Sequence, residues 1–219
     1  MKHTSKMILS AFLITALLCG IVPQAWAVSS TSDEETKVDS SIELQADEVS
    51  ATPGWELFGS CEWKINNGTL TIRPANKNEQ GKLPDNTRAW PWSSNRKTIE
   101  QVMIEGHVVC GNSMTMMFFD CSSLVTADLS GLDTSNVLYM DGTFDYCSSL
   151  TTLDLSGFDT SNTKSMYIMF RYCTSLKSID LSGFDTTNVY EFSGMFRGCE
   201  SLTSLDLSNF HTPKATQME

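Results

Sequence analysis

Residues 169–189 read MFRYCTSLKSIDLSGFDTTNV, and this stretch decides the fold because its pattern returns along the chain. Equivalent residues recur every 26 positions in several independent columns. The columns are Phe118, Phe144, Phe170 and Phe196; Cys121, Cys147, Cys173 and Cys199; Leu124, Leu150, Leu176 and Leu202; and Asp128, Asp154, Asp180 and Asp206. One period shared by so many columns indicates a tandem repeat, which is the signature of stacked architectures.

Within one repeat, the spacing of the apolar residues changes from that of a strand to that of a helix. Ile179 and Leu181 alternate with polar residues, which predicts a short strand. The segment 183–188 is rich in Gly, Asp, Thr and Asn, which favour a turn and the start of a helix. A helix with one apolar stripe is then predicted from residues three or four apart: Val189, Phe192, Met195, Phe196 and Cys199.

A single unit of this kind cannot bury its own apolar side, so the copies must stack to form a core. The Leu-x-x-Leu-x-Leu spacing in units of this length is typical of leucine-rich repeats. The predicted fold is therefore α/β, a right-handed leucine-rich-repeat solenoid of strand-turn-helix units. Parallel strands lie about 4.8 Å apart, whereas helices lie about 8–10 Å apart. We therefore expect the stack to curve, with the strands on its concave side.

The string Met-Phe-x-x-Cys-x-Ser-Leu-x-x-Leu-Asp-Leu-Ser-x-Phe-Asp-Thr-Ser-Asn-Val resembles the 26-residue repeat of the BspA-like leucine-rich-repeat family of bacterial surface proteins. Residues 169–189 match it with Ile179 and Thr187 as mild departures, and the resemblance extends over 117–219. It implies a cell-surface protein, typical of low-GC Gram-positive bacteria, that acts through adhesion or other protein contacts. It implies no catalytic residues.

The first 27 residues have the pattern of a signal peptide. Lys2 and Lys6 flank the start of an apolar run over 7–22, which is shorter than the roughly 20 residues of a membrane span. The run is followed by Ala25-Trp26-Ala27, a small-x-small cleavage site. We predict cleavage after Ala27, export, and no membrane span in the mature chain. Lipidation at Cys19 is the alternative, which Leu18 disfavours because a small residue is required there.

Residues 28–52 are predicted to be a flexible acidic spacer. They contain seven acidic residues against Lys37 alone, together with many Ser and Thr and no aromatic residue. Such a composition does not bury enough apolar surface to offset the entropy of ordering.

Residues 53–116 are predicted to form an N-terminal cap with β-structure. Asn67-Gly68 is a favoured two-residue turn, which predicts a hairpin over 63–72. Two large rings are expected to cover the open end of the first repeat, Trp90 and Trp92. The Leu-x-x-Leu-x-Leu spacing returns as a degenerate first strand at Ile99, Val102 and Ile104.

Residues 117–219 contain about four repeats, of which the last is truncated. Leu205 and Leu207 are predicted to form an edge strand without a neighbour. The sequence as given has no wall-sorting motif, basic tail or C-terminal apolar anchor. We therefore expect it to be part of a longer protein, and we expect the chain made alone to self-associate through its last strand.

The composition argues against several classes of function. The formal charge is −11, from 26 acidic and 15 basic residues, and a nucleic-acid-binding protein needs a basic surface instead. The three histidines, His3, His107 and His211, are scattered and supply no zinc cluster. Phosphate-binding glycine loops and nucleophile motifs are missing from the sequence, so we expect neither an enzyme nor a cofactor.

The cysteine column is predicted to be core rather than disulfide. Its members lie on the predicted apolar stripe, on helices about 8–10 Å apart, whereas a disulfide requires Cα atoms within about 7 Å. Cys61 and Cys110 in the cap form a separate pair, for which a disulfide remains open.

Two aspartate columns have different expected roles. The first column is Asp128, Asp154, Asp180 and Asp206. Its carboxylates, stacked about 4.8 Å apart, repel one another, and this repulsion is expected to raise some of their pKa values. Hydroxyls from the neighbouring serines, a bound calcium ion and a basic partner are the three ways of offsetting this repulsion. The second column is expected to cap the helices: Asp133, Asp159 and Asp185.

The strand face is the predicted binding site. Its outward residues are Thr126, Asp128, Ser130, Thr152, Asp154, Ser156, Ser178, Asp180, Ser182, Ser204, Asp206 and Ser208. We expect a secreted or cell-surface protein that binds a protein ligand, such as a host extracellular-matrix or surface protein. The alternative is a structural spacer of a larger cell-wall protein, without a ligand of its own.

Overall fold

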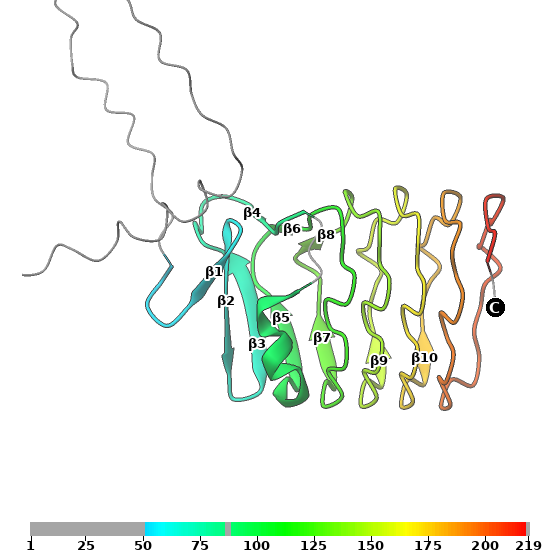
Figure 1. The fold of residues 1–219 in the computed structure, drawn as a ribbon, viewed down its shortest axis with the longest axis horizontal. Coiled ribbons are helices and arrows are strands. Elements are labelled where there is room, and N and C mark those ends of the chain that lie inside the picture. The colour runs from blue at the N-terminus through cyan, green and yellow to red at the C-terminus, as the bar shows by residue number, and fades with distance from the viewer. Residues whose placement is uncertain (1–50, 86–88, 218–219) are drawn as a thin grey trace, which may run out of the picture. The chain divides into compact units, whose positions relative to one another are not determined.

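The computed structural model describes residues 51–85 and 89–217, which belong to one compact unit, Asp47–Glu219 (Figure 1). The predicted signal peptide, residues 1–27, and all but the last two residues of the predicted spacer, residues 28–52, lie outside the described residues. Across the described part of the chain, none of the helical structure is long and apolar enough to cross a membrane.

Short strands and turns make up the described chain. The elements are β1 (Glu56–Phe58), β2 (Cys61–Asn66), β3 (Thr69–Pro74), β4 (Gly81–Lys82), the 3-10 helix η1 (Pro91–Thr98), β5 (Gln101–Ile104), β6 (Val108–Val109), β7 (Thr126–Asp128), β8 (Leu132–Asp133), β9 (Thr152–Leu153) and β10 (Ser178–Ile179). One sheet has the order β1-β2-β3-β5-β7, and β4-β6-β8 and β10-β9 form smaller sheets. The α/β prediction is thus corrected, because the described residues form sheets and turns with a single 3-10 helix.

The cap contains the predicted hairpin. β2 and β3 pair antiparallel, and the turn residues Asn67 and Gly68 have φ values of 47° and 76°. Positive φ at both positions is what a tight two-residue hairpin turn requires. β5 then joins β3 and β7, both in parallel, with Val102 and Ile104 buried. The predicted degenerate first strand is therefore confirmed.

Two tryptophans cover the first repeat, as predicted. Trp90 and Trp92 are almost completely buried, and their rings stack with centroids 5.3 Å apart. Each indole N–H donates to a backbone carbonyl, that of Trp90 to Thr115 and that of Trp92 to Met117, both at 2.8 Å. The rings thus provide apolar cover for the first repeat and hydrogen bonds to its backbone.

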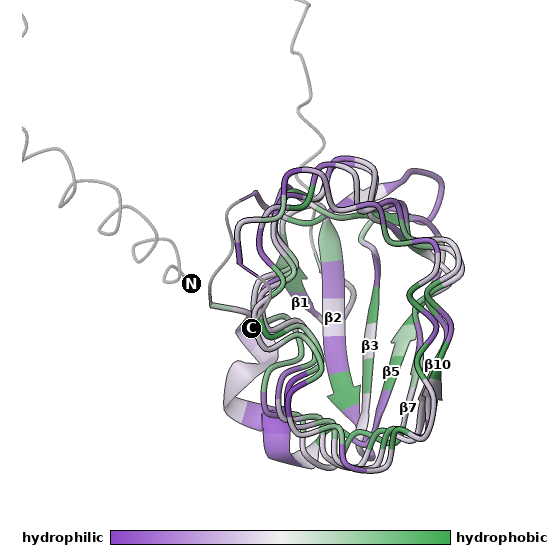
Figure 2. Cartoon of the chain, turned by 90° about the vertical axis from the view of Figure 1, so that its right-hand side faces the viewer, coloured by the Kyte–Doolittle hydropathy of each residue, from purple (hydrophilic) through white to green (hydrophobic). Residues whose placement is uncertain are grey.

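Behind the cap, successive coils of the chain stand side by side (Figure 1) and overlie one another when viewed along the stack (Figure 2). Parallel bridges join residues that are 26 positions apart, from Ser113 through Tyr139, Ser165 and Glu191 to Gln217. β7, β9 and β10 lie on one side of these coils. The 26-residue period of the sequence is therefore the step from one coil to the next.

The predicted repeat helices are wrong. Turns take their place in every described coil, and each coil has two residues with left-handed backbone four positions apart. The two columns are Met116, Gly142, Ile168 and Gly194, and Asp120, Tyr146, Tyr172 and Gly198, with φ between 50° and 75°. An α-helix needs right-handed backbone at each residue, so these columns interrupt it twice per repeat.

Backbone groups that a helix would satisfy internally bond to the next coil instead. Phe170 N–H donates to Met195 O at 2.9 Å, and Tyr172 N–H donates to Arg197 O at 2.7 Å. The side predicted to be helical therefore keeps a close spacing between coils. Ring centroids are 5.5, 5.8 and 5.5 Å apart along the stacked column Phe118, Phe144, Phe170 and Phe196. The curved stack was predicted because helices need a wider spacing than strands. These coils have turns in place of helices, so that reason for curvature is absent here.

The interior holds the predicted apolar columns. The Phe rings of the first three coils are completely buried, and the leucine and methionine columns lie beside them. The buried members are Phe118, Phe144, Phe170, Leu124, Leu150, Leu176, Met117, Met169 and Met195. These columns form one continuous cluster with the cap residues, so a core shared between stacked units is confirmed.

The last coil departs from the prediction. Leu205 is half-buried and Leu207 is 41% exposed, but neither lies in a strand. The expected edge strand is therefore replaced by irregular chain and a turn. The right-handedness of the coil stays a prediction.

Candidate functional site

All twelve residues of the predicted strand face are exposed. The short strands present alternate residues inward and outward, because successive side chains of a strand point to opposite sides. Leu153 of β9 is buried, whereas the preceding Thr152 is exposed and pairs in register with Ser178 of β10. Thr126 occupies the corresponding exposed position on β7. The repeat thus places outward hydroxyls in a row across the coils.

Each carboxylate of the first aspartate column bonds to the serine two residues later. Ser130 donates to Asp128 Oδ1 through its N–H at 3.1 Å and through its hydroxyl at 2.7 Å. In the next three coils the serine N–H donates to the aspartate at 2.9 Å each: Ser156 to Asp154, Ser182 to Asp180 and Ser208 to Asp206. Local hydrogen bonds therefore satisfy each carboxylate: the backbone N–H of the following serine donates in all four coils, and a serine hydroxyl donates as well at Asp128.

The expected rise in the pKa values of this column is wrong. The Ser130 hydroxyl lowers the pKa of Asp128, and the N–H of the following serine is the largest cause of lowering at the other three carboxyls. Repulsion from neighbouring carboxylates does act to raise the pKa of Asp128 and Asp180. The local hydrogen bonds outweigh it, because they stabilise the ionised form directly.

Acidification is expected to destabilise the chain partly through this column. Folded-state pKa values below the ordinary 3.8 mean that the ionised carboxylates stabilise the fold above that pH, and that this stabilisation is lost as the pH falls through the lowered values. The urea midpoint should fall between about pH 5 and pH 2. Replacing all four aspartates with asparagine, which keeps an oxygen acceptor, should weaken that fall. An identical acid profile in the asparagine variant would contradict this assignment.

The second aspartate column starts turns instead of helices. Asp133, Asp159 and Asp185 each accept the N–H of the residue two positions later at 2.9 Å. The predicted role as an acceptor of backbone N–H groups is right, but no helix follows. These aspartates therefore fix turn geometry.

The strand face extends onto the cap, which the sequence prediction missed. Met103 of β5 is 40% exposed and pairs in register with Asp128. Further along the same sheet, the Arg73 guanidinium lies 3.7 Å and the Lys64 ammonium 4.3 Å from the ring centroid of Trp55. The sequence contained one signal for this extension, since inward Val102 and Ile104 place Met103 outward.

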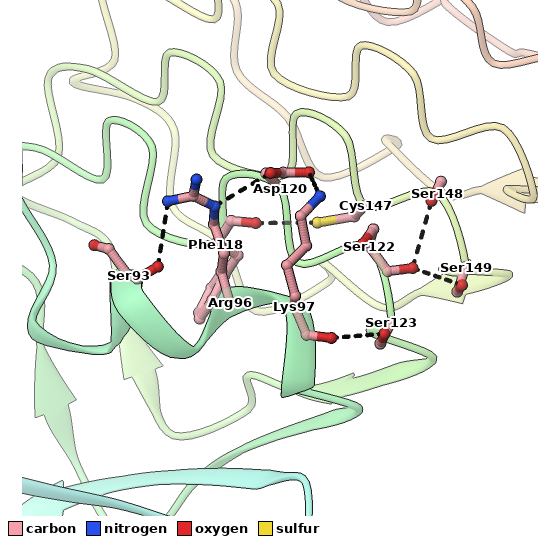
Figure 3. Close-up of polar contacts among 10 residues, drawn as sticks. All are labelled: Ser93, Arg96, Lys97, Phe118, Asp120, Ser122, Ser123, Cys147, Ser148 and Ser149. Carbon is pink, nitrogen blue, oxygen red and sulfur yellow. Dashed lines mark hydrogen bonds and ion pairs between the residues drawn. The ribbon is translucent and has the colours of Figure 1, made fainter.

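Ion pairs tie the coils together away from the strand face. Arg171 makes two hydrogen bonds to the buried carboxylate of Asp145, at 2.9 and 2.7 Å. Asp120 accepts from Arg96 at 3.2 Å and from Lys97, both on η1 (Figure 3). The cap is therefore joined to the first repeat by charge as well as by the tryptophan rings.

The cysteine column is part of the core, as predicted. Each thiol after the first coil bonds to the carbonyl of the phenylalanine 29 residues earlier, at 3.1–3.2 Å. The pairs are Cys147 with Phe118 (Figure 3), Cys173 with Phe144, and Cys199 with Phe170. The sequence argument against disulfides relied on a wide spacing between helices, which does not apply because these residues form turns. The thiols are instead held by hydrogen bonds to carbonyls. Cys61 and Cys110 are also buried free thiols.

The native thiols are expected to resist alkylation and thiol-disulfide exchange. Burial raises the pKa of Cys61 and of Cys121 to about 12, and raises that of Cys147 well above its ordinary value. The thiolate is the reactive form, so little of it exists at pH 8. Ellman's reagent should react slowly with the native chain and should titrate all six described cysteines in denaturant. Fast reaction of the folded chain, or a titration of only four of these six, would contradict this picture.

Within the described residues, no group of three or more His, Cys, Asp and Glu side chains is placed to hold a metal ion. The acidic column therefore presents single carboxylates, each bonded within its own turn. What the strand face offers chemically is hydroxyl donors and acceptors with a row of negative charges.

The chain shows limited similarity to known proteins. Residues 112–219 match the model of a family described as "Mycoplasma protein of unknown function, DUF285". None of the curated proteins matches the sequence. Among solved structures, the chain is similar to the leucine-rich repeat protein of T. pallidum, with 12% identity, 71% of this chain and 96% of that chain covered, and a TM-score of 0.26.

Proposed function

We propose that this chain is an exported, non-catalytic leucine-rich-repeat protein of the BspA-like type, which binds a protein ligand at the cell surface. Its coils form a right-handed solenoid in this proposal, and its first 27 residues are removed on export. The observation that carries the proposal is the strand face, on which twelve exposed hydroxyl and carboxylate side chains repeat across successive coils. Repeat proteins use extended surfaces of this kind to bind partners.

The chemistry of the face favours a partner with basic side chains. Asp128, Asp154, Asp180 and Asp206 are ionised at neutral pH, since their pKa values are lowered. Lys177 is an exposed cation beside them on the repeat strands. A predominantly negative surface attracts a positive partner and weakens that attraction as salt is added. A host extracellular-matrix or surface protein with a basic patch fits this requirement.

An attachment assay tests the proposal. Beads coated with the chain are applied to host-cell monolayers, and the adhering beads are counted for the unaltered chain and for the double variant Thr152→Arg/Ser178→Arg. These two exposed residues are register partners at the centre of the face. Two arginines there add bulk and reverse the local charge, so attachment should be lost.

The matched control is Thr187→Arg, an exposed residue of a turn outside the strand rows. It should attach like the unaltered chain. Equal attachment by all three proteins would contradict a binding role for the face and would favour the structural-spacer alternative.

A further inference from the structure

A cavity of about 390 Å³ lies between η1 of the cap and the turn at residues 116–121 of the first coil. Its lining includes the buried residues Trp92, Met117 and Cys121. Met116 and Phe119, which also line it, are half-buried. The volume falls within the range of pockets that bind ligands, and such pockets are mostly apolar with a few polar groups. The junction of the cap and the first repeat is therefore an apolar pocket that is accessible from solvent.

The polar groups at this pocket leave an excess of positive charge. Arg96 lines the pocket, and its guanidinium donates to Asp120 at 3.2 Å and to the Ser93 carbonyl at 3.3 Å (Figure 3). Lys97 binds the same carboxylate of Asp120. Two cations thus share one acid, and none of the described residues that line the pocket is acidic. Although the chain as a whole is acidic, this site favours an acidic ligand.

The apolar surface of the pocket continues over the next two coils as a row of aromatic rings. The ring centroid of Phe119 lies 6.2 Å from that of Tyr146, which lies 4.7 Å from that of Tyr172. The Arg171 guanidinium lies 5.4 and 5.8 Å from the two tyrosine rings and is held in place by Asp145. Tyrosine and arginine are enriched among the residues that dominate protein–protein binding.

The two tyrosines hold their exposed positions at a conformational cost. Tyr146 and Tyr172 have left-handed backbone, with φ of 61° and 56°, where the equivalent residues of the neighbouring coils are Asp120 and Gly198. This region is unfavourable for bulky side chains and is adopted readily by glycine. The Tyr146 ring is 39% exposed, so burial does not fully offset the cost. Strained residues of this kind cluster at functional sites, which indicates a use for these rings outside the core.

We propose that this pocket and the aromatic row form a docking site for a protein segment with an aromatic anchor residue between acidic neighbours. The anchor enters the pocket, the neighbouring carboxylates face Arg96 and Lys97, and the bound chain crosses Tyr146. An aromatic anchor seated in a pocket with a polar rim is the usual centre of a protein interface. A small aromatic acid would use only the pocket, whereas the row of rings favours a polypeptide. The site shares no residue with the strand face.

Methionine NMR tests the proposal, because two methionines line the pocket. The protein is labelled with carbon-13 at its methionine methyl groups and titrated with the tripeptide Glu-Trp-Glu, blocked at both ends. The resonances of Met116 and Met117 should shift, and that of Met195, three coils away, should not. The peptide Lys-Trp-Lys should bind about tenfold more weakly, because its charges are repelled. Glu-Ala-Glu, which has no anchor, should cause no shift.

Variants at the charged rim should change the affinity for Glu-Trp-Glu in opposite directions. Lys97→Gln removes one cation and should weaken binding about fivefold, the factor for one exposed ion pair. Asp120→Asn frees both cations and should strengthen binding by a similar factor. The matched control is Lys177→Gln on the strand face, which should leave the affinity unchanged.

A second pair of variants tests the aromatic row. Tyr146→Ala should weaken binding about fivefold through loss of an aromatic contact. Tyr167→Ala removes a similarly exposed ring outside the row and should have no effect.

The proposal fails if Glu-Trp-Glu leaves the Met116 and Met117 resonances unmoved, or if Lys-Trp-Lys binds equally well. Unchanged affinity in Lys97→Gln and Asp120→Asn would overturn the role of the rim charges. Equal affinity for free indole-3-acetate, together with unchanged affinity in Tyr146→Ala, would overturn a polypeptide ligand.

Discussion

Replacing Phe144 with alanine is expected to lower the free energy of unfolding by about 3–5 kcal/mol, the range measured for large aromatic residues in cores. Phe144 is completely buried, and its ring lies between those of Phe118 and Phe170, at centroid distances of 5.5 and 5.8 Å. Truncation therefore removes apolar burial and leaves a cavity between two coils. Close packing on both sides limits how far the neighbours can fill it.

Urea unfolding of the two chains measures this effect. The control is Tyr167→Ala, which removes a ring that is 43% exposed on a neighbouring coil. It should change the unfolding free energy by a much smaller amount. Comparable losses in both variants would contradict the claim that the phenylalanine column is the interior of the stack.

Replacing Arg171 with methionine is expected to cost about 3–5 kcal/mol, because it leaves the buried carboxylate of Asp145 without its partner. The guanidinium supplies two hydrogen bonds to this carboxylate across neighbouring coils. Methionine keeps much of the apolar stem but donates no hydrogen bond. The result should be a lower urea midpoint with an unchanged far-ultraviolet spectrum.

A double-mutant cycle separates the ion pair from packing. Adding Asp145→Asn to Arg171→Met should recover a large part of the lost stability, since the uncompensated charge is then removed. The matched control is Arg197→Met in the same column, which has no ion pair among the described residues and should be nearly neutral. Additive losses in the double variant would contradict the coupling of Arg171 to Asp145.

The parts of the fold predicted from sequence are those that depend on the period and on inward-facing residues. The 26-residue step, the phenylalanine and leucine columns, the hairpin at Asn67-Gly68 and the tryptophan cover all follow from patterns that burial enforces. The outward position of the strand-face residues follows in the same way. Burial constrains these residues whether the connecting chain is helical or not.

The repeat helices were mispredicted because a coil of tight turns also places every third or fourth residue inward. What distinguishes the two is the backbone, which is left-handed twice in each coil. The sequence contained a signal in Gly142, Gly194 and Gly198, since glycine disfavours a helix interior and adopts positive φ readily. At Gly198 an added Cβ would lie 2.5 Å from the Tyr172 ring. Tyr172 itself has a φ of 56°, so no residue type marks every such position.

The lowered pKa values of Asp128, Asp154, Asp180 and Asp206 were also not predicted, because their cause lies within each turn. Spacing between coils predicts repulsion, but Ser130, Ser156, Ser182 and Ser208 turn their N–H groups onto the carboxylates. Short-range hydrogen bonds to an ionised group outweigh repulsion between groups in solvent. The Asp-x-Ser spacing can be read from the sequence, but the turn that brings the serine N–H onto the carboxylate cannot.

The account rests on one claim, that 26 residues of chain make one interchangeable coil of a stack. Deleting residues 145–170 removes one period and joins Phe144 to Arg171, the residue that ordinarily follows the equivalent Phe170. Deleting residues 145–157, half as many, destroys the register. The first variant should still unfold cooperatively in urea, with a smaller dependence of the unfolding free energy on urea concentration. The second variant should show no cooperative unfolding transition. Equal disruption by the two deletions would contradict the claim.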